Sequence, residues 1–152
     1  MQKARLILPE RKTPDASSMP DAGATAGLGG LFVSAFLSAT LLPGGSEAVL
    51  AGLLALRPEL WFPALLLATL GNTLGGMTTY LMARLLPRKE MPARLNWLEK
   101  YGSTTLLLSW VPLIGDALCA GAGLLRLPWP ACLLWMAVGK GLRYAAIAWA
   151  MS

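Results

Sequence analysis

Long stretches without charged residues constrain this sequence more than any other feature. Residues 60–83 contain no charge, and residues 23–56 and 101–125 contain one each. Only 14% of the chain is charged, whereas a soluble domain usually carries about 25%. A run of about 18 or more apolar residues is a candidate membrane span. We therefore predict an all-α integral membrane protein.

Turn-forming residues interrupt the first apolar stretch. Pro43, Gly44 and Gly45 separate two arms, residues 28–42 and 46–56. Each arm is shorter than the roughly 20 residues that a helix needs to cross the hydrocarbon. Because proline and glycine end helices and form tight turns, the pattern predicts a re-entrant helical hairpin that returns to the side it entered. Simple loop turns are the alternative interpretation of the prolines.

The second part of the chain follows the same design. Pro112 and Gly115 interrupt the apolar segment 104–125, whereas segments 60–83 and 128–151 are long enough to span a bilayer. We expect two re-entrant helical hairpins plus two transmembrane helices.

The domain organisation follows from the polar segments. Residues 1–22 are rich in charge and proline and predict a disordered tail, so residues 23–152 would form a single membrane domain. An amphipathic linker at 84–101 would separate the halves 28–83 and 102–151 and lie on the membrane surface.

The two halves come into register after a shift of 69 residues, which places Pro43 on Pro112 and Glu47 on Asp116. The further matches are Gly52 with Gly121, Arg57 with Arg126 and, after a slip of one residue, Gly71-Asn72 with Gly139-Lys140. One hairpin and one span per half would insert the second half upside down, which is the inverted repeat of many transporters. Chance matching of common residues is the alternative.

Four ionisable residues lie inside the apolar segments: Glu47, Asp116, Lys140 and Arg143. A charge at mid-bilayer costs a few kcal/mol, so such residues tend to pair or to line a pathway. We expect the two acids to approach each other, with a base pairing at least one of them, and to form a substrate and proton pathway. Helix capping by the acids and snorkelling of the bases are the alternatives. Asn72 would touch substrate or serve helix packing.

Several classes of chemistry are excluded. The chain has no histidine, and its two cysteines lie in apolar segments, so no metal site and no cofactor are expected. No serine has a histidine to activate it, so an enzyme is not expected. The net charge of +5 lies mostly at the edges of the apolar stretches, which suits lipid phosphates and not nucleic acid.

These segments together resemble the DedA family, also named for SNARE-associated Golgi proteins, and most closely its short YqaA-like branch. The resemblance is carried by residues 42–47, 71–76 with Tyr80 and Arg84, 100–102 and 110–123. It implies two facing re-entrant hairpins, a multi-pass protein of the bacterial inner membrane, and lipid-linked transport that depends on the proton gradient. It also implies a functional acid at Glu47. The family pattern places arginines where this chain has Ser109 and Gly115, so Lys140 and Arg143 would supply the positive charge instead.

The leading functional hypothesis is a transporter or flippase for an anionic lipid or lipid carrier, with proton coupling left open. The expected partners are membrane lipids, lipid phosphates among them, and protons, with no nucleic acid; a homo-oligomer stays open. The alternatives are a non-transporting protein that supports envelope integrity or assembly, and a small-solute transporter. Charges inside the membrane favour transport over scaffolding.

Overall fold

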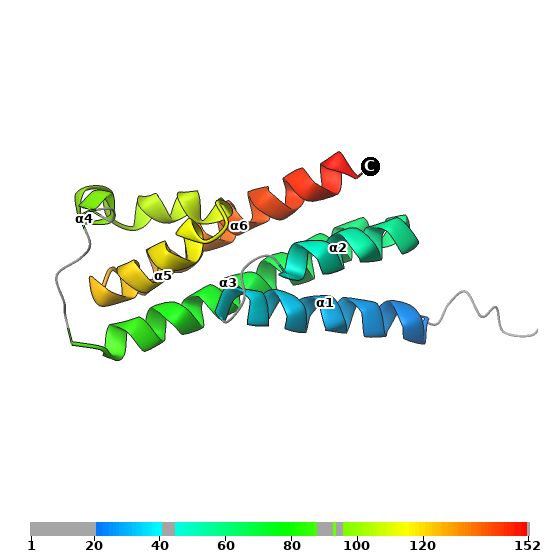
Figure 1. Ribbon diagram of the computed structural model, residues 1–152, viewed down its shortest axis with the longest axis horizontal. Helices are drawn as coiled ribbons and strands as arrows, with labels where there is room; N and C mark the ends of the chain where they lie inside the picture. Colours follow the sequence, from blue (N-terminus) through cyan, green and yellow to red (C-terminus); the bar gives the residue numbers. More distant parts are fainter. Residues whose placement is uncertain (1–20, 41–44, 88–92, 94–95, 152) are drawn as a thin grey trace, which may run out of the picture.

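The computed structural model describes residues 21–40, 45–87, 93 and 96–151, and within them every regular element is a helix (Figure 1). The tail before Asp21, the turn residues Pro43 and Gly44, and linker residues 88–92 and 94–95 lie outside this part of the chain. The elements in order are α1 (Ala22–Thr40), α2 (Gly45–Leu56), η2 (Pro58–Leu60), α3 (Trp61–Leu85), α4 (Asn96–Tyr101), η4 (Gly102–Trp110), α5 (Ile114–Leu124) and α6 (Trp129–Ala150).

Three helical segments are long and apolar enough to cross a membrane: α1, the continuous η2–α3 segment, and α6. The sequence led us to expect two such helices, and α1 is the third of sufficient length because it begins at Ala22 and not near Leu28. The added residues are alanine, glycine and threonine, and alanine has the strongest helix propensity, so they extend the helix. At about 1.5 Å per residue α1 is about 28 Å long, close to the hydrocarbon thickness. Helices α2 and α5 are short, as expected.

The two helix pairs α1–α2 and η4–α5 lie toward opposite ends of the long axis (Figure 1). Helix α2 begins near the middle and runs toward the end that holds the C-terminus, whereas α5 begins near the middle and runs the other way (Figure 1). Helices α3 and α6 extend alongside both pairs. The N-termini of α2 and α5 therefore both lie in the central part of the molecule.

On α3, mostly small residues face the interior and large apolar residues face outward, which is the reverse of a helix in a soluble bundle. On α3 the buried face consists of Ala64, Ala68, Gly71, Asn72, Thr73, Gly75, Gly76, Tyr80 and Ala83. The exposed face carries Leu66, Leu70, Leu74 and Leu81. Helices that associate within lipid have little hydrophobic drive to bury leucine, so close packing through small residues holds them together.

Glycines mark the closest helix contacts. A Cβ added at Gly71 would lie 2.6 Å from the Phe32 carbonyl oxygen of α1, and one added at Gly139 would lie 2.6 Å from the Leu107 carbonyl oxygen of η4. A real Cβ cannot approach so closely, so both positions require glycine while the backbones stay in place. The predicted repeat register, after its slip of one residue, aligns Gly71 with Gly139.

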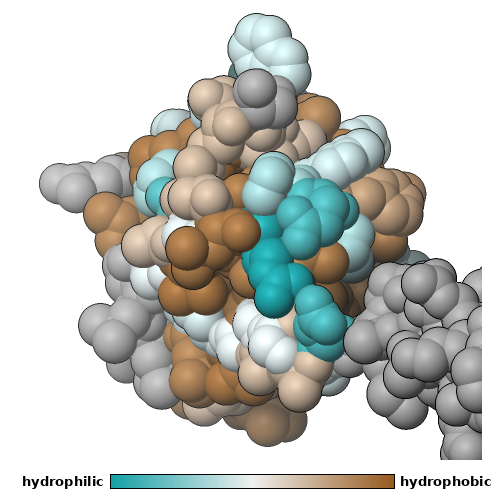
Figure 2. Space-filling view, turned by 90° about the vertical axis from the view of Figure 1, so that its right-hand side faces the viewer, coloured by the Kyte–Doolittle hydropathy of each residue, from teal (hydrophilic) through white to brown (hydrophobic). Residues whose placement is uncertain are grey.

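Hydrophilic groups occur at the end where α1 begins and α2 ends. There Arg57 forms ion pairs with Asp21 at 3.1 Å and with Glu59 at 3.8 Å. Figure 2 faces this end and shows hydrophilic side chains gathered in one patch beside apolar ones. The patch is typical of a helix end that meets water and headgroups.

Candidate functional site

Lys140 is the most deeply buried charge in the described chain, with 2% of its side chain exposed. Its ammonium group donates hydrogen bonds to the Asn72 carbonyl oxygen at 3.1 Å, to Asn72 Oδ1, and to Asp116 Oδ1 at 3.3 Å. These bonds use all three donors of the ammonium, which meets the requirement that a buried charge be paired and hydrogen-bonded. Snorkelling therefore does not describe Lys140.

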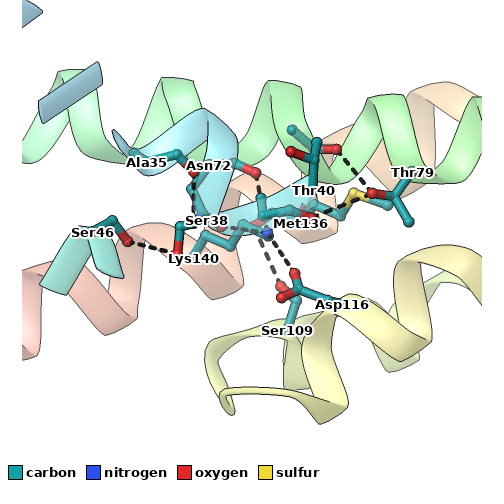
Figure 3. A network of polar contacts seen from close by, with 12 residues as sticks. Ala35, Ser38, Thr40, Ser46, Asn72, Thr79, Ser109, Asp116, Met136 and Lys140 are labelled. Carbon is teal, nitrogen blue, oxygen red and sulfur yellow. Dashed lines mark hydrogen bonds and ion pairs between the residues drawn. The ribbon is translucent and has the colours of Figure 1, made fainter. Parts of the chain in front are cut away.

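The surroundings of Lys140 come from four helices. Asn72 on α3 accepts from Lys140 and donates from Nδ2 to the Ala35 carbonyl oxygen of α1 at 3.2 Å. Gly76, one turn further along α3, leaves room for the ammonium, because a Cβ there would lie 3.2 Å from Nζ. Figure 3 shows Lys140 between Asn72 and Asp116, with Ser38 and Ser46 beyond. The site thus joins α1, α3, α5 and α6.

The second ion pair joins Arg143 of α6 to Glu47 of α2. The Arg143 side chain is 14% exposed and the Glu47 side chain 32% exposed. Since Lys140 and Arg143 are three residues apart, they share one face of α6, and each base neutralises one acid. The described residues show no direct hydrogen bond between the two carboxylates.

Both acids occupy equivalent places in short helices. Glu47 is the third residue of α2, and Asp116 is the third residue of α5. The positive end of the helix dipole stabilises a carboxylate there. No side chain caps the N-terminus of α5 by a hydrogen bond, and Asp116 directs its oxygen to Lys140. Helix capping alone therefore does not explain Asp116.

A chain of hydroxyl groups lies beside the Glu47–Arg143 pair. Tyr144, fully buried on α6, forms a 2.7 Å hydrogen bond with Ser46 Oγ, and Ser46 Oγ is 3.5 Å from Ser38 Oγ. This chain ties α1, α2 and α6 together. The sequence analysis did not identify it, although Ser46 and Tyr144 each directly adjoin a predicted site residue.

A tight turn joins η4 to α5 between Pro112 and Gly115. Leu113 has φ 67° and ψ −52°, and the Ile114 amide donates to the Pro112 carbonyl oxygen at 2.8 Å. These values define a γ-turn of the rare, strained kind, centred on a residue with a side chain. At the first predicted turn, Gly45 opens α2, while Pro43 and Gly44 lie outside the described residues.

The two positions where the family pattern has arginine lie against each other in this turn. A Cβ on Gly115 would be 2.5 Å from the Ser109 carbonyl oxygen, and Ser109 is itself buried, with Oγ 3.5 Å from the Met136 carbonyl oxygen. Neither position has room for a long side chain. The cations in this region are instead Lys140 and Arg143 on the adjacent helix α6.

Comparison with known proteins agrees with this architecture. Residues 42–152 match the VTT domain. The chain is 44% identical over 122 residues to the inner membrane protein YqaA of Escherichia coli, covering 78% of this chain and 86% of the relative. It is 41% identical over 131 residues to an uncharacterized protein of Haemophilus influenzae, covering 77% of this chain and 82% of the relative. No solved structure matches. Together with three helices able to cross a membrane, these similarities identify the chain as a multi-pass inner-membrane protein of the VTT-domain, or DedA, family.

Proposed function

We propose that this protein moves an anionic lipid or lipid carrier, such as a lipid phosphate, across the inner membrane. The observation that carries the proposal is the pairing of two bases on α6 with acids that belong to two different short helices. A purely structural bundle has no need of buried charges, because apolar residues pack at least as stably. Charges inside a membrane are typical of substrate and proton pathways.

The exposed fractions of the four side chains indicate which member of each ion pair an anionic substrate would replace. Lys140 and Arg143 are largely buried, whereas about a third of each acid side chain is exposed. An anionic headgroup that enters the site would replace an acid as the partner of a base. The released carboxylate would then take up a proton, because an unpaired anion is costly away from water. Return of the proton would re-form the ion pair and expel the headgroup.

The proposal includes two re-entrant hairpins arranged as an inverted repeat. Two observations support it. The pairs α1–α2 and η4–α5 come from opposite ends and meet near the middle (Figure 1). The first arm of each pair packs on the long helix of its own half, at Gly71 and at Gly139. The length of α1 would also allow a complete crossing, so the topology needs a direct test.

Cysteine accessibility supplies that test. A cysteine placed at Gly45 in a background without Cys119 and Cys132 should resist a bulky impermeant thiol reagent from both sides of the membrane. A control cysteine at the exposed Leu56, at the far end of α2, should react from one side. Reaction at position 45 from the side opposite to position 56 would mean that α1 and α2 both cross, and would overturn the hairpin.

The function is tested by reconstitution into vesicles that contain a fluorescent lipid phosphate. Glu47→Gln keeps the size of the side chain and removes its charge and its proton, so it should abolish transport while the protein stays folded. The matched control is Arg57→Gln, which removes an ion pair at the exposed end of the molecule and should transport normally. Wild-type transport by Glu47→Gln would reject the role of this pair, and no transport by the wild type would reject the proposed function.

A further inference from the structure

An open groove of about 580 Å³ lies along the face of α1 that no other described helix covers. Its lining is mainly apolar, with Val33 and Leu37 exposed along it. Gly29 and Gly30 form part of its floor, and a Cβ added at either would meet no atom within 4 Å. The groove therefore exists because two side chains are missing from an otherwise bulky helix face. Its volume lies within the range of roughly 300–1,000 Å³ that is typical of ligand sites.

The groove ends at polar groups. Ser38 and Gly45 line that end. Ser38 belongs to the hydroxyl chain that continues through Ser46 to Tyr144, and Gly45 opens the helix that carries Glu47. The polar end of the groove thus adjoins a buried chain of hydroxyl groups, and two of its members, Ser46 and Tyr144, are the sequence neighbours of Glu47 and Arg143. A molecule that lay in the groove and reached the ion pair would need a hydrocarbon chain and an anionic headgroup.

We propose that the groove holds one hydrocarbon chain of the anionic lipid, with the headgroup directed toward Ser38, Ser46 and the Glu47–Arg143 pair. The inference rests on the proposed function and gives a binding place to the hydrocarbon chain of the substrate, which the charged site cannot bind. Helix α1 is a candidate membrane span, so the groove opens to lipid and not to water. A chain moving from the bilayer into the groove gains little hydrophobic free energy, so the groove contributes shape selection and orientation, while the charge contributes the affinity.

A second copy of the chain is the competing occupant. Gly30 and Ser34 are four residues apart on α1, and small residues at this spacing often pack one membrane helix against another. We favour the lipid because a partner helix would leave the connection to the ion pair without a role.

The test uses the full chain in vesicles with two photoactivatable lipids. Both carry the reactive group at the same place in the same chain; one is a phosphatidic acid and the other is zwitterionic. We expect the acidic lipid to label residues 29–38 more strongly than its zwitterionic partner. Gly30→Leu, which fills the groove, should lose this labelling. Gly52→Leu is the matched control, because Gly52 is an exposed helix glycine with no atom near its Cβ, outside the groove. It should label as the wild type does.

Arg143→Gln should remove the preference for the acidic lipid and leave labelling by both lipids. Equal labelling by the two lipids in the wild type would mean ordinary boundary lipid, and would overturn the inference. Efficient cross-linking between two copies through Ser34→Cys, without labelling by lipid, would assign the groove to a dimer and overturn it as well. Selective labelling in vesicles that show no transport would support the groove and reject the proposed transport function, so the two failures are distinguishable.

Discussion

The two halves predicted from the sequence have one close helix contact in common and differ in their charges. Gly71 of α3 and Gly139 of α6 each meet a carbonyl oxygen of the first arm of their own half. The next residue along differs, since α3 has Asn72 where α6 has Lys140. These two aligned residues hydrogen-bond directly to each other. The close backbone contact requires glycine at both aligned positions, whereas the neighbouring position accepts asparagine in one helix and lysine in the other.

The difference extends one turn further. In the same register Gly75 of α3 aligns with Arg143 of α6, so both bases lie on the second long helix. The acids remain divided, with Glu47 in the first half and Asp116 in the second. The two predicted halves thus pack through similar glycine contacts, but Lys140 and Arg143, the two bases of the ion pairs, both lie on α6. The following changes test this interpretation, from the largest expected effect to the smallest.

Lys140→Met should have the largest effect on stability. It removes the buried ammonium and leaves both Asp116 and Asn72 without their partner. Breaking a buried pair typically costs about 3–5 kcal/mol of unfolding free energy, and the partial exposure of Asp116 favours the low end, about 3 kcal/mol. Unfolding of the purified protein in mixed micelles measures the change.

A double-mutant cycle separates the ion pair from the loss of packing. If the cost comes from an unpaired carboxylate, adding Asp116→Asn to Lys140→Met should restore part of the lost stability. Arg143→Met should cost less than Lys140→Met, because Arg143 is more exposed. Equal costs at the two bases would contradict the expected dependence of the cost on burial.

Gly71→Ala and Gly139→Ala should destabilise the protein to a similar degree, by about 2 kcal/mol each, because each forces two backbones apart. Gly52→Ala is the control: its Cβ would meet no neighbour, and the higher helix propensity of alanine should stabilise by up to about 1 kcal/mol. Thermal unfolding of the three variants in one detergent compares them. A large cost at one aligned glycine and none at the other would contradict the shared packing.

Leu113→Gly should have the smallest effect and the opposite sign. The predicted repeat register places Leu113 on Gly44, so this change gives the η4–α5 turn the residue type found at the matching sequence position. Leu113 has positive φ, where a side chain causes strain, and it is 65% exposed, so little packing is lost. We expect a gain of about 1 kcal/mol at most, since relief of strain is partly offset by the greater chain entropy of glycine. A loss of stability would mean that the Leu113 side chain contributes more than its turn costs.

The sequence was sufficient to predict the helices and the four interior charges, because uninterrupted apolar stretches and isolated ionisable residues are local features. It was not sufficient to predict the start of α1, since Gly23 to Gly27 have neither bulk nor charge to mark a boundary. The hydrogen bond between Tyr144 and Ser46 joins residues that are 98 positions apart, and no local sequence pattern predicts such a contact. The γ-turn was missed because a leucine is not expected at positive φ.

The location of both bases on α6 has a consequence for biosynthesis. Because the chain is made from its N-terminus, Glu47 and Asp116 are synthesised before Lys140 and Arg143, the bases that pair with them. Each unpaired acid in the hydrocarbon costs about 2.5–3.5 kcal/mol on insertion scales. A chain that lacks α6 therefore carries two acids without their ion-pair partners, so the short helices α2 and α5 depend on α6 to neutralise their charges.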